Sequence, residues 1–529
     1  MKTKTIKSPE TTAQRLSSLI KGCRDIMRKD KGMNGDADRL PMLTWIMFLK
    51  FLDDVEQEQE TKALLKRQTY KSAISSPYRW RDWAKNQNLT GDDFLAFISS
   101  ERAILPDGTE GVGLFYYLRG LQSETGSGRK DVIATVFKGV TNRMINGYLL
   151  RDVVNKIDAI HFNSTEEIYT LSHLYESILK EMRDASGDAG EFYTPRPVVK
   201  FMVEMLNPQL GESVLDPAAG TGGFLVEAFE HLRKQAVNTE GYEILQTRSI
   251  YGGEAKPLPY LLCQMNLLLH GLEYPILDSG NSLRNPLRDI SDKDRVNIIL
   301  TNPPFGGEEE RGILNNFPDD MRTAETALLF LQLIMRKLKR VSPYGGTEGG
   351  RGGRAAVVVP NGTLFADGIA ARIKEQMLKE YNLHTIVRLP DGVFAPYTDI
   401  PANLLFFEQG KATQAVWYYE MSAPDGRKKY SKTKPIQNEE FEAISAWWQN
   451  RTETDNAWCI PVSTILQYDD KNKLLSANLD RKNPNRKSDN EYIDPAFAMS
   501  MILEKEKEIW DLMTDIKALI QADKEVVAL

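Results

Sequence analysis

Hydrophobic positions recur at helical spacing along the first part of the chain, from about residue 10 to residue 165. Apolar residues three and four positions apart lie on one face of a helix, so this spacing predicts a series of amphipathic helices. Turn-rich stretches interrupt the pattern, and none of them carries a catalytic signature. We therefore predict an N-terminal all-helical domain over residues 1–165. Two of its apolar faces are Leu16, Leu19, Ile20 and Cys23, and Leu43, Met47, Phe48 and Leu52.

The pattern changes between about residues 166 and 415, where short apolar runs alternate with helical stretches. This alternation indicates βα units and a parallel sheet, and therefore an α/β domain. Two of the runs, 386–390 and 403–408, are too close in sequence for a long crossover helix, so we expect them to pair antiparallel at an edge of the sheet. The other candidate strands are 213–216, 249–253, 296–301 and 355–360.

The C-terminal region, residues 416–529, is mixed in character and turns basic and polar through 481–490. One helix from about 496 to 522 is predicted to end it. Apolar residues in this helix follow 3–4–3 spacing with charges between them, which indicates a short coiled-coil stripe. The stripe fits packing on its own chain and packing on a partner equally well. It consists of Ile502, Ile509, Leu512, Ile516 and Leu519.

The glycine-rich segment 344–354 has the composition of a surface loop. Arg351 and Arg354 leave open that this loop contacts DNA.

Composition and charge limit the class of protein. The 529 residues are 41% hydrophobic and 26% charged, which is typical of a globular protein with several domains. The net charge of −6 lacks the positive excess of a stand-alone DNA-binding protein, so any basic surface is local or comes from a partner. Three distant cysteines, a polar start and no apolar run of about 18 residues predict a cytoplasmic protein without disulfides or membrane spans.

A glycine-rich turn at 213–229 is the first candidate site. The predicted strand ends at Asp216, and a helix begins near Gly223, so the N–H groups of the turn face any ligand there. Leu225 occupies the third glycine position of a dinucleotide motif, which disfavours a nicotinamide or flavin enzyme. An acid at the strand tip repels phosphate and suits a positive amino group, such as that of S-adenosylmethionine. The alternative is a tight β–α turn with packing glycines.

Two further segments follow at the ends of predicted strands. Glu254 lies just after the second strand, where a carboxylate can accept hydrogen bonds from ribose hydroxyls. Asp278 and Asn281 carry polar groups suited to the adenine ring of the cofactor, although a plain turn explains them equally well.

The segment 298–307 gives the sharpest chemical signal. Asn302, Pro303, Pro304 and Phe305 follow a buried strand, at the edge where ligands bind in open α/β sheets. The prolines stiffen the turn and leave carbonyl groups free as acceptors. The Asn302 side-chain oxygen and the Pro303 carbonyl can accept from one NH₂ group, while the aromatic ring stacks on a planar base. Two such acceptors free the nitrogen lone pair for attack on a sulfonium methyl group.

An aromatic segment, 190–206, precedes these motifs. Thr194 can cap a helix that has Pro195 at its first position. Phe192 and Tyr193 then lie just before the helix, either as a wall for the cofactor's adenine or as a hydrophobic staple.

In this order, GEFYTPRP, DPAAGTGGF, GGEAKP, TNPPFGG and RAAVVVPNGTLF resemble the modification (M) subunits of type I restriction-modification systems, which are γ-type N6-adenine DNA methyltransferases. The resemblance covers about residues 140 to 410. It implies a Rossmann-like seven-stranded sheet in a catalytic domain over 166–415, and a tail helix that binds a partner. It also implies methyl transfer from S-adenosylmethionine to the N6 amino group of an adenine flipped out of double-stranded DNA.

The resemblance assigns roles to individual residues. The catalytic tetrapeptide is Asn302 to Phe305, with Phe305 stacking on the target base and either Phe394 or Tyr397 clamping it. Asn281 stands where such enzymes often have aspartate. The cofactor-binding residues are Phe192, Tyr193, Thr194, Asp216, Ala218, Gly220, Thr221, Gly222, Glu254 and Asn281.

Such M subunits work with a specificity (S) subunit, commonly as two M to one S, and restriction (R) subunits join some complexes. The acidic net charge agrees with a partner that supplies most of the DNA-binding surface. Two other classes also fit the tetrapeptide: methyltransferases for RNA bases or protein glutamine, and a non-catalytic DNA-binding scaffold. A leading asparagine favours adenine over the N4 position of cytosine. No histidine lies in a motif, and no metal site is predicted.

Overall fold

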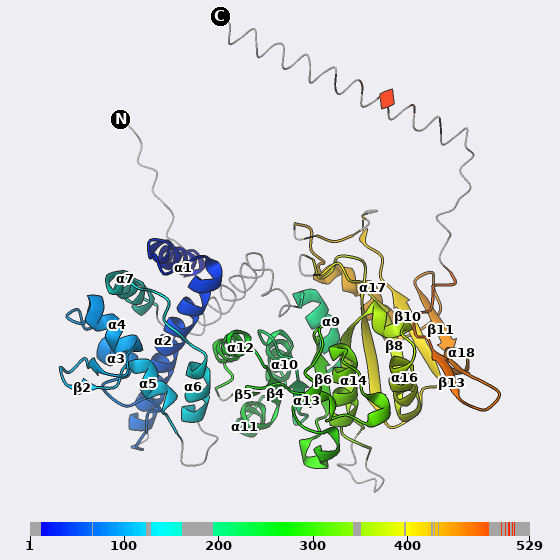
Figure 1. The fold of residues 1–529 in the computed structure, drawn as a ribbon, viewed down its shortest axis with the longest axis horizontal. Coiled ribbons are helices and arrows are strands. Elements are labelled where there is room, and N and C mark those ends of the chain that lie inside the picture. Colours follow the sequence, from blue (N-terminus) through cyan, green and yellow to red (C-terminus); the bar gives the residue numbers. More distant parts are fainter. Residues whose placement is uncertain are drawn as a thin grey trace, which may run out of the picture.

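The computed structural model describes most of the chain and shows an elongated molecule (Figure 1). Helices from the N-terminal part form one end, and a large sheet with its helices forms the other (Figure 1). Phe192, Tyr193, Tyr397 and nearly all of the predicted tail helix lie outside the described residues. The described residues are 12–65, 67–122, 129–160, 194–273, 275–341, 351–395, 398–424, 427, 429–431, 433–485 and six helical positions between 499 and 513.

The N-terminal part is helical, as predicted, apart from one small hairpin. Strands β1 (Ala103–Ile104) and β2 (Glu110–Gly111) pair antiparallel, so the prediction of an all-helical domain is wrong at this point. Gly108 in the intervening turn has a left-handed φ of 84°, which reverses the chain tightly. The helices are α1 (Thr12–Met27), α2 (Asp36–Leu65), α3 (Trp80–Trp83), α4 (Gly91–Ser99), α5 (Leu114–Arg119), α6 (Arg129–Lys138) and α7 (Gly147–Asp158).

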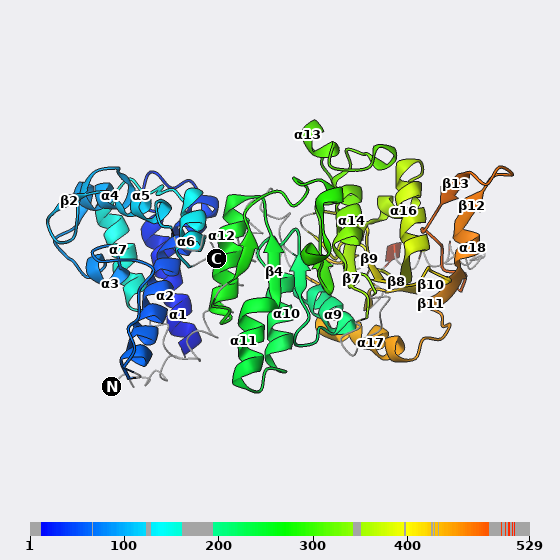
Figure 2. The same ribbon diagram turned by 90° about the horizontal axis from the view of Figure 1, so that it is seen from below.

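Helix α12 (Pro257–Leu269) joins the two parts of the molecule. It lies between the N-terminal helices and the sheet in both ribbon views (Figures 1 and 2). Its side chains Tyr260, Leu262 and Met265 belong to the same buried cluster as the N-terminal helices. On another face, its Cys263 and Leu267 belong to the core of the sheet. The helix therefore contributes to both hydrophobic cores, and burial on both sides stabilises their contact.

The sheet has nine strands in the order β11-β10-β8-β9-β7-β6-β3-β4-β5, two more than the seven predicted. All neighbours are parallel except at β9 and β11. Strands β8 and β9 pair antiparallel as expected, but they lie inside the sheet because β10 and β11 continue it. The strands are β3 (Val214–Asp216), β4 (Ile250–Gly253), β5 (Ile276–Asp278), β6 (Ile298–Thr301), β7 (Arg354–Pro360), β8 (Tyr381–Arg388), β9 (Ala402–Gln409), β10 (Ala415–Glu420) and β11 (Ala457–Pro461).

Helices cover both faces of this sheet. Along β6, Ile298 and Leu300 pack on one side with α9, α10 and α17, while Ile299 packs on the other with α14 and α16. A strand buried on both faces needs apolar residues throughout, which explains the unbroken buried run of β7. The helices of this part are α9 (Arg196–Leu206), α10 (Gly223–Arg233), α11 (Thr239–Arg248), α13 (Arg311–Leu314), α14 (Thr326–Lys337), α15 (Asn361–Phe365), α16 (Ile369–Glu380), α17 (Glu442–Gln449) and α18 (Val462–Ile465).

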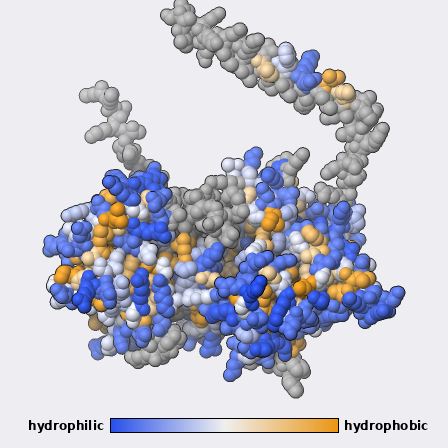
Figure 3. Space-filling view, viewed as in Figure 1, coloured by the Kyte–Doolittle hydropathy of each residue, from blue (hydrophilic) through white to orange (hydrophobic). Residues whose placement is uncertain are grey.

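Strands β10 and β11 come from the sequence after the predicted boundary at residue 415. The sheet therefore continues into the C-terminal region, where a small hairpin of β12 (Leu466–Tyr468) and β13 (Leu474–Ala477) follows. The visible surface is largely hydrophilic, with small hydrophobic areas spread over both parts (Figure 3). Within the described residues, no helix has both the length and the apolar character needed to cross a membrane.

Arg354 is not part of a surface loop. It begins β7, is almost fully buried, and forms an ion pair with Glu212 at 2.7 Å. Its guanidinium group also donates to the backbone carbonyls of Leu206 and Asn207. A DNA contact by Arg354 is therefore excluded, and Arg351 pairs with Glu408 at 3.2 Å.

Candidate active site

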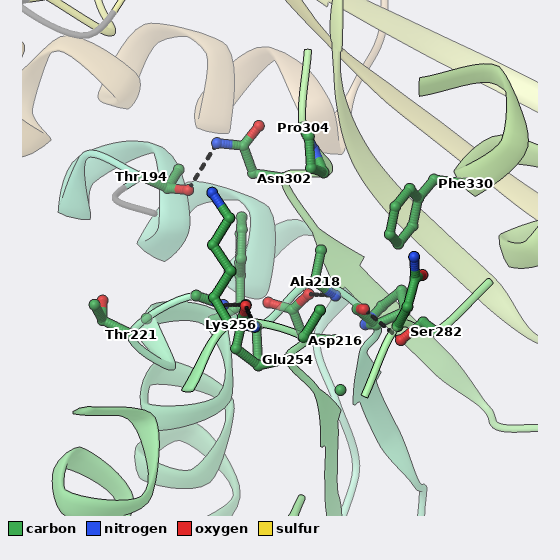
Figure 4. A pocket seen from close by; sticks show the side chains of 18 of the residues that line it. Thr194, Asp216, Ala218, Thr221, Glu254, Lys256, Ser282, Asn302, Pro304 and Phe330 are labelled. Atoms are coloured by element: carbon green, nitrogen blue, oxygen red, sulfur yellow. Dashed lines mark hydrogen bonds between the residues drawn. The ribbon is translucent and has the colours of Figure 1, made fainter. Parts of the chain in front are cut away.

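A cavity of about 280 Å³ opens at the carboxyl ends of β3, β4 and β6. The start of α9 forms one wall, and Phe330 of α14 forms the opposite one (Figure 4). The carboxyl edge of a parallel sheet gathers loops from several strands, so segments far apart in sequence meet here. Nine residues singled out from the sequence line this cavity: Thr194, Asp216, Ala218, Gly220, Thr221, Glu254, Asn281, Asn302 and Pro304.

The glycine turn between β3 and α10 depends on backbone conformations that favour glycine. Gly220 has a φ of 53° and Gly222 a φ of 81°, both in the left-handed region. A Cβ atom on Gly222 would also lie 2.7 Å from the Sγ atom of Cys263 in α12. Gly222 does not line the cavity, so its role in the turn is to let α10 begin close to α12.

Asp216 forms the buried floor beneath the turn, with 1% of its surface exposed. Its Oδ1 atom accepts hydrogen bonds from the Ala218 N–H at 3.0 Å and from the Thr301 hydroxyl at 2.7 Å. Burial, with a smaller contribution from the charge of Glu254, raises the pKa of Asp216 to about 7 against these hydrogen bonds. A positive ligand group beside it would favour its ionised form.

Glu254 connects the end of β4 to the glycine turn. Its two carboxylate oxygens accept from the Gly220 N–H at 2.9 Å and from the Lys256 N–H at 2.8 Å. Burial raises the pKa of Glu254 above its ordinary value. Each carboxylate oxygen has two lone pairs, so the oriented group retains acceptor capacity for a ligand hydroxyl.

The Asn302 amide lies at the cavity edge with a fixed orientation. Its Nδ2 atom donates to Oγ1 of Thr194 at 3.1 Å, and the amide oxygen points away from that bond (Figure 4). This Oδ1 atom is buried and has no hydrogen-bond partner among the described residues. A buried acceptor without a donor costs about 1–3 kcal/mol, so the arrangement suits a ligand that brings an N–H group.

Phe305 lies outside the lining of the cavity and is half-buried. Its ring centroid is 5.5 Å from that of Phe394, and the two rings meet edge to face at 72°. Phe394 has only 4% of its surface exposed, so it supports Phe305 from behind. Pro303 is buried and also does not line the cavity.

Sequence reasoning missed several residues of this cavity. Arg196 lies within the aromatic segment and donates from Nη1 to the Gly223 carbonyl at 2.9 Å; burial lowers its pKa to about 10. Lys256 follows Glu254 by two positions, so the same motif could have suggested it. Phe330 and Glu309 carry no local signal, because tertiary packing alone brings them to the cavity. Ser282 also lines it and donates to the Pro217 carbonyl at 2.6 Å.

Comparisons with known families match almost the whole chain. A family described as N-6 DNA Methylase matches residues 166–482, and the HsdM N-terminal domain matches residues 16–157. The methylase subunit of the type I restriction enzyme EcoEI, from Escherichia coli, is 43% identical over 518 residues, which cover 96% of this chain and 98% of that subunit.

Two solved structures extend these comparisons. A modification subunit from Vibrio vulnificus is 66% identical, with a TM-score of 0.82 over 91% of this chain and 99% of that one. A structure concerned with complex assembly and conformational transition of a type I restriction-modification system is 38% identical. Its TM-score is 0.75, over 97% of this chain and 99% of that one.

Proposed function

Because the chain belongs to the N-6 DNA methylases, as a methylase subunit of type I restriction enzymes, we propose how its cavity performs that activity. The subunit transfers a methyl group to the N6 amino group of adenine in DNA. In the proposal, the cavity binds S-adenosylmethionine, and the target adenine enters from the side of Asn302 and Phe305. An adenine inside a duplex cannot reach such a site, so it must be flipped out of the stack.

The unpartnered oxygen of Asn302 is the observation that carries this proposal. Thr194 holds the amide nitrogen, so the free oxygen is oriented to accept from the adenine amino group. The Pro303 carbonyl is the proposed second acceptor. Together they draw the amine toward sp³ geometry and free its lone pair, which is otherwise delocalised into the ring. A fixed acceptor in a water-poor site stabilises the reacting geometry without reorganisation.

The residues of the cavity fit S-adenosylmethionine. When bound, this cofactor supplies an electrophilic methyl group on a positively charged sulfur. Gly220, in the left-handed region, lets the backbone approach the ligand closely, and Glu254 offers its remaining lone pairs to ribose hydroxyls. Asp216 supplies negative charge for the positive amino group, while Ala218 and Thr221 line the walls. Phe192 and Tyr193 remain proposed as aromatic neighbours of the cofactor.

Phe305 is the proposed stacking partner of the flipped base. An aromatic ring stacked on a base contributes about 1–3 kcal/mol, and Phe394 holds the Phe305 ring in place from behind. Phe394 is too deeply buried to offer its own face, so its proposed role is to position Phe305. Tyr397 remains the proposed alternative for clamping the base from the other side.

The subunit acts as part of a larger enzyme. We propose that one S subunit binds this chain and a second copy of it, and that R subunits can join this complex of two M subunits and one S subunit. The S subunit would supply sequence recognition and much of the DNA grip, in agreement with the net charge of −6. Residues 1–165 and the C-terminal helix are the proposed partner-binding parts, and 166–415 carries the catalytic residues. Light scattering of the purified complex would test the stoichiometry.

The test of the proposed chemistry is methylation by the complex with the S subunit. The complex is incubated with methyl-labelled S-adenosylmethionine and unmethylated DNA, and the nucleosides are then analysed. We expect N6-methyladenine with the wild type and a loss of at least about a hundredfold with Asn302→Ala, because an oriented acceptor is removed. DNA binding by the complex should persist in this variant.

Asn450→Ala is the matched control, since this exposed asparagine follows α17. It should methylate DNA at the wild-type rate. Label in RNA or protein with none in DNA would contradict the proposed substrate. Full activity of Asn302→Ala would contradict the role given to its amide.

A further inference from the structure

We propose that Glu309 binds the exocyclic amino group of the cofactor's adenine ring, and that Asn281 positions it. This inference rests on the proposed function, because it assumes that S-adenosylmethionine occupies the cavity. It reassigns the contact that the sequence suggested for Asn281. Both residues line the cavity, on loops that follow β5 and β6.

Both ends of the Asn281 side-chain amide form hydrogen bonds within the protein. Its Oδ1 atom accepts from the Leu283 N–H at 2.9 Å, within its own turn. Its Nδ2 atom donates to Oε2 of Glu309 at 3.0 Å, and both residues line the cavity. The first bond fixes which end of the amide faces Glu309. Asn281 therefore presents a donor to the carboxylate and orients it.

Glu309 keeps an acceptor for a ligand. Its Oε1 atom makes no hydrogen bond within the part of the chain that the structure describes, and the side chain is half-buried at the cavity. An ionised carboxylate accepts hydrogen bonds and donates none. A ligand that meets this oxygen must therefore bring an N–H or O–H group.

The backbone of Glu309 is held in place. Its N–H donates to the Ala324 carbonyl at 3.2 Å, and Glu308 forms an isolated antiparallel bridge with Glu325. The Thr326 hydroxyl donates to the Gly307 carbonyl at 3.1 Å. These contacts fix the loop to the start of α14. A preorganised acceptor costs less entropy on binding than one on a free loop.

An aromatic ring lies at this end of the cavity. Phe330, one helical turn into α14, has 5% of its surface exposed and faces the side of Ser282 (Figure 4). Thr194 and Asn302 lie away from it on the other side of the view, and Asp216 and Glu254 lie below them near its centre (Figure 4). A flat apolar ring beside a hydrogen-bond acceptor recognises a heteroaromatic ring with an amino group. The cofactor's adenine fits this end, while its ribose would lie at Glu254.

The test compares two ligands by isothermal titration calorimetry on the complex with the S subunit. One is S-adenosylhomocysteine, and the other is its purine analogue with hydrogen in place of the 6-amino group. We expect the wild type to bind the amino form about tenfold to a hundredfold more tightly, as a hydrogen bond to a charged acceptor predicts. In Glu309→Gln, Nδ2 of Asn281 donates to the amide oxygen of the new glutamine. The NH₂ group of that glutamine then faces the ligand. The preference should then fall to about one or reverse.

Glu309→Ala should also bring the preference to about one, because the acceptor is absent. Glu310→Gln is the matched control in the same loop, and it should keep the wild-type preference. Equal weakening of both ligands by Glu309→Gln would overturn the proposal, because it would show that Glu309 only closes the cavity. An unchanged preference would also overturn it while leaving the proposed function intact. Failure of the wild type to bind either ligand would count against the cofactor site itself.

Discussion

The side-chain nitrogen of Asn302 lies 3.1 Å from the hydroxyl oxygen of Thr194, although 108 positions separate the two residues in the sequence. The hydrogen bond joins the segment before α9 to the loop after β6. It leaves the Asn302 oxygen as the end of the amide that can meet a substrate. Thr194 is therefore a positioning residue for the proposed catalytic acceptor, besides its place in the lining of the cavity.

Replacing Thr194 by valine should lower kcat for DNA methylation by about tenfold to a hundredfold, because Asn302 loses the acceptor that orients it. Thr194→Ser keeps the hydroxyl and should retain most of the activity. Single-turnover methylation by the complex with the S subunit measures both. Equal activity of the valine and serine variants would contradict the positioning role.

Gly222→Ala should destabilise the protein by about 2–4 kcal/mol, from the left-handed backbone and from the contact of the new Cβ with Cys263. Gly271→Ala separates the two costs, because Gly271 has a φ of 93° with nothing within 4 Å of its added Cβ. We expect about 1 kcal/mol there. Thermal unfolding measures both losses, and Cys263→Ala should partly rescue Gly222→Ala. Equal losses at the two glycines would contradict the steric explanation.

Binding of a positively charged cofactor near pH 7 should release a proton from Asp216. Burial raises the pKa of this group to about 7 in the folded protein, against about 3.9 in an unfolded chain. The raised pKa therefore costs stability progressively as the pH rises from about 4 to 7, and the full cost persists above that range. A cation beside Asp216 lowers the pKa and expels up to about half a proton at pH 7.

Calorimetry of cofactor binding in two buffers with different ionisation enthalpies measures this proton. Asp216→Asn should release fewer protons than the wild type under the same conditions. The difference between the two measures the Asp216 carboxyl together with its coupling to the positive group beside it. Identical proton release would place the positive group elsewhere in the cavity.

Phe305→Ala should reduce kcat/KM by about tenfold to a hundredfold through loss of base stacking, and Phe305→Tyr should retain most activity. Phe394→Leu should cause a smaller loss, because it removes only the ring that supports Phe305. Methylation rates at a single target site compare the three variants. A larger effect of Phe394→Leu than of Phe305→Ala would reverse the roles given to the two rings.

Much of the candidate site could be predicted because its residues follow strands in a regular order. Asp216, Glu254 and Asn302 each come just after the apolar run of a strand that the sequence marks clearly. The carboxyl ends of parallel strands share one edge, so this order alone brings the three together. The motifs also predict Gly222 and Phe305 in this site, but both lie behind its lining.

The less regular elements were harder to predict. Strand β5 has only three residues and alternates between exposed and half-buried positions, so it lacks a continuous apolar run. Strand β10 begins where the sequence indicates a domain boundary. A β-strand near a sheet edge needs less apolar surface than a central one, which weakens its periodic signal. The apolar runs therefore predict six of the nine strands and miss β5, β10 and β11, while the seven-stranded sheet was what the family resemblance implied.

The amino-acid sequence alone was enough to identify the family, the positions of the central strands along the chain, and the residue types that meet at the edge of the sheet. Local periodicity is sufficient to locate the strands, and the motifs with their spacing are sufficient to identify the family, because both can be read along the chain without knowledge of the fold. Three relationships follow from the packing of the folded chain: Thr194 orients Asn302, Asn281 donates to Glu309, and Phe330 forms a wall of the cavity. Such contacts depend on how helices and loops pack across the sheet. No short stretch of sequence encodes the distance between side chains that lie far apart along the chain.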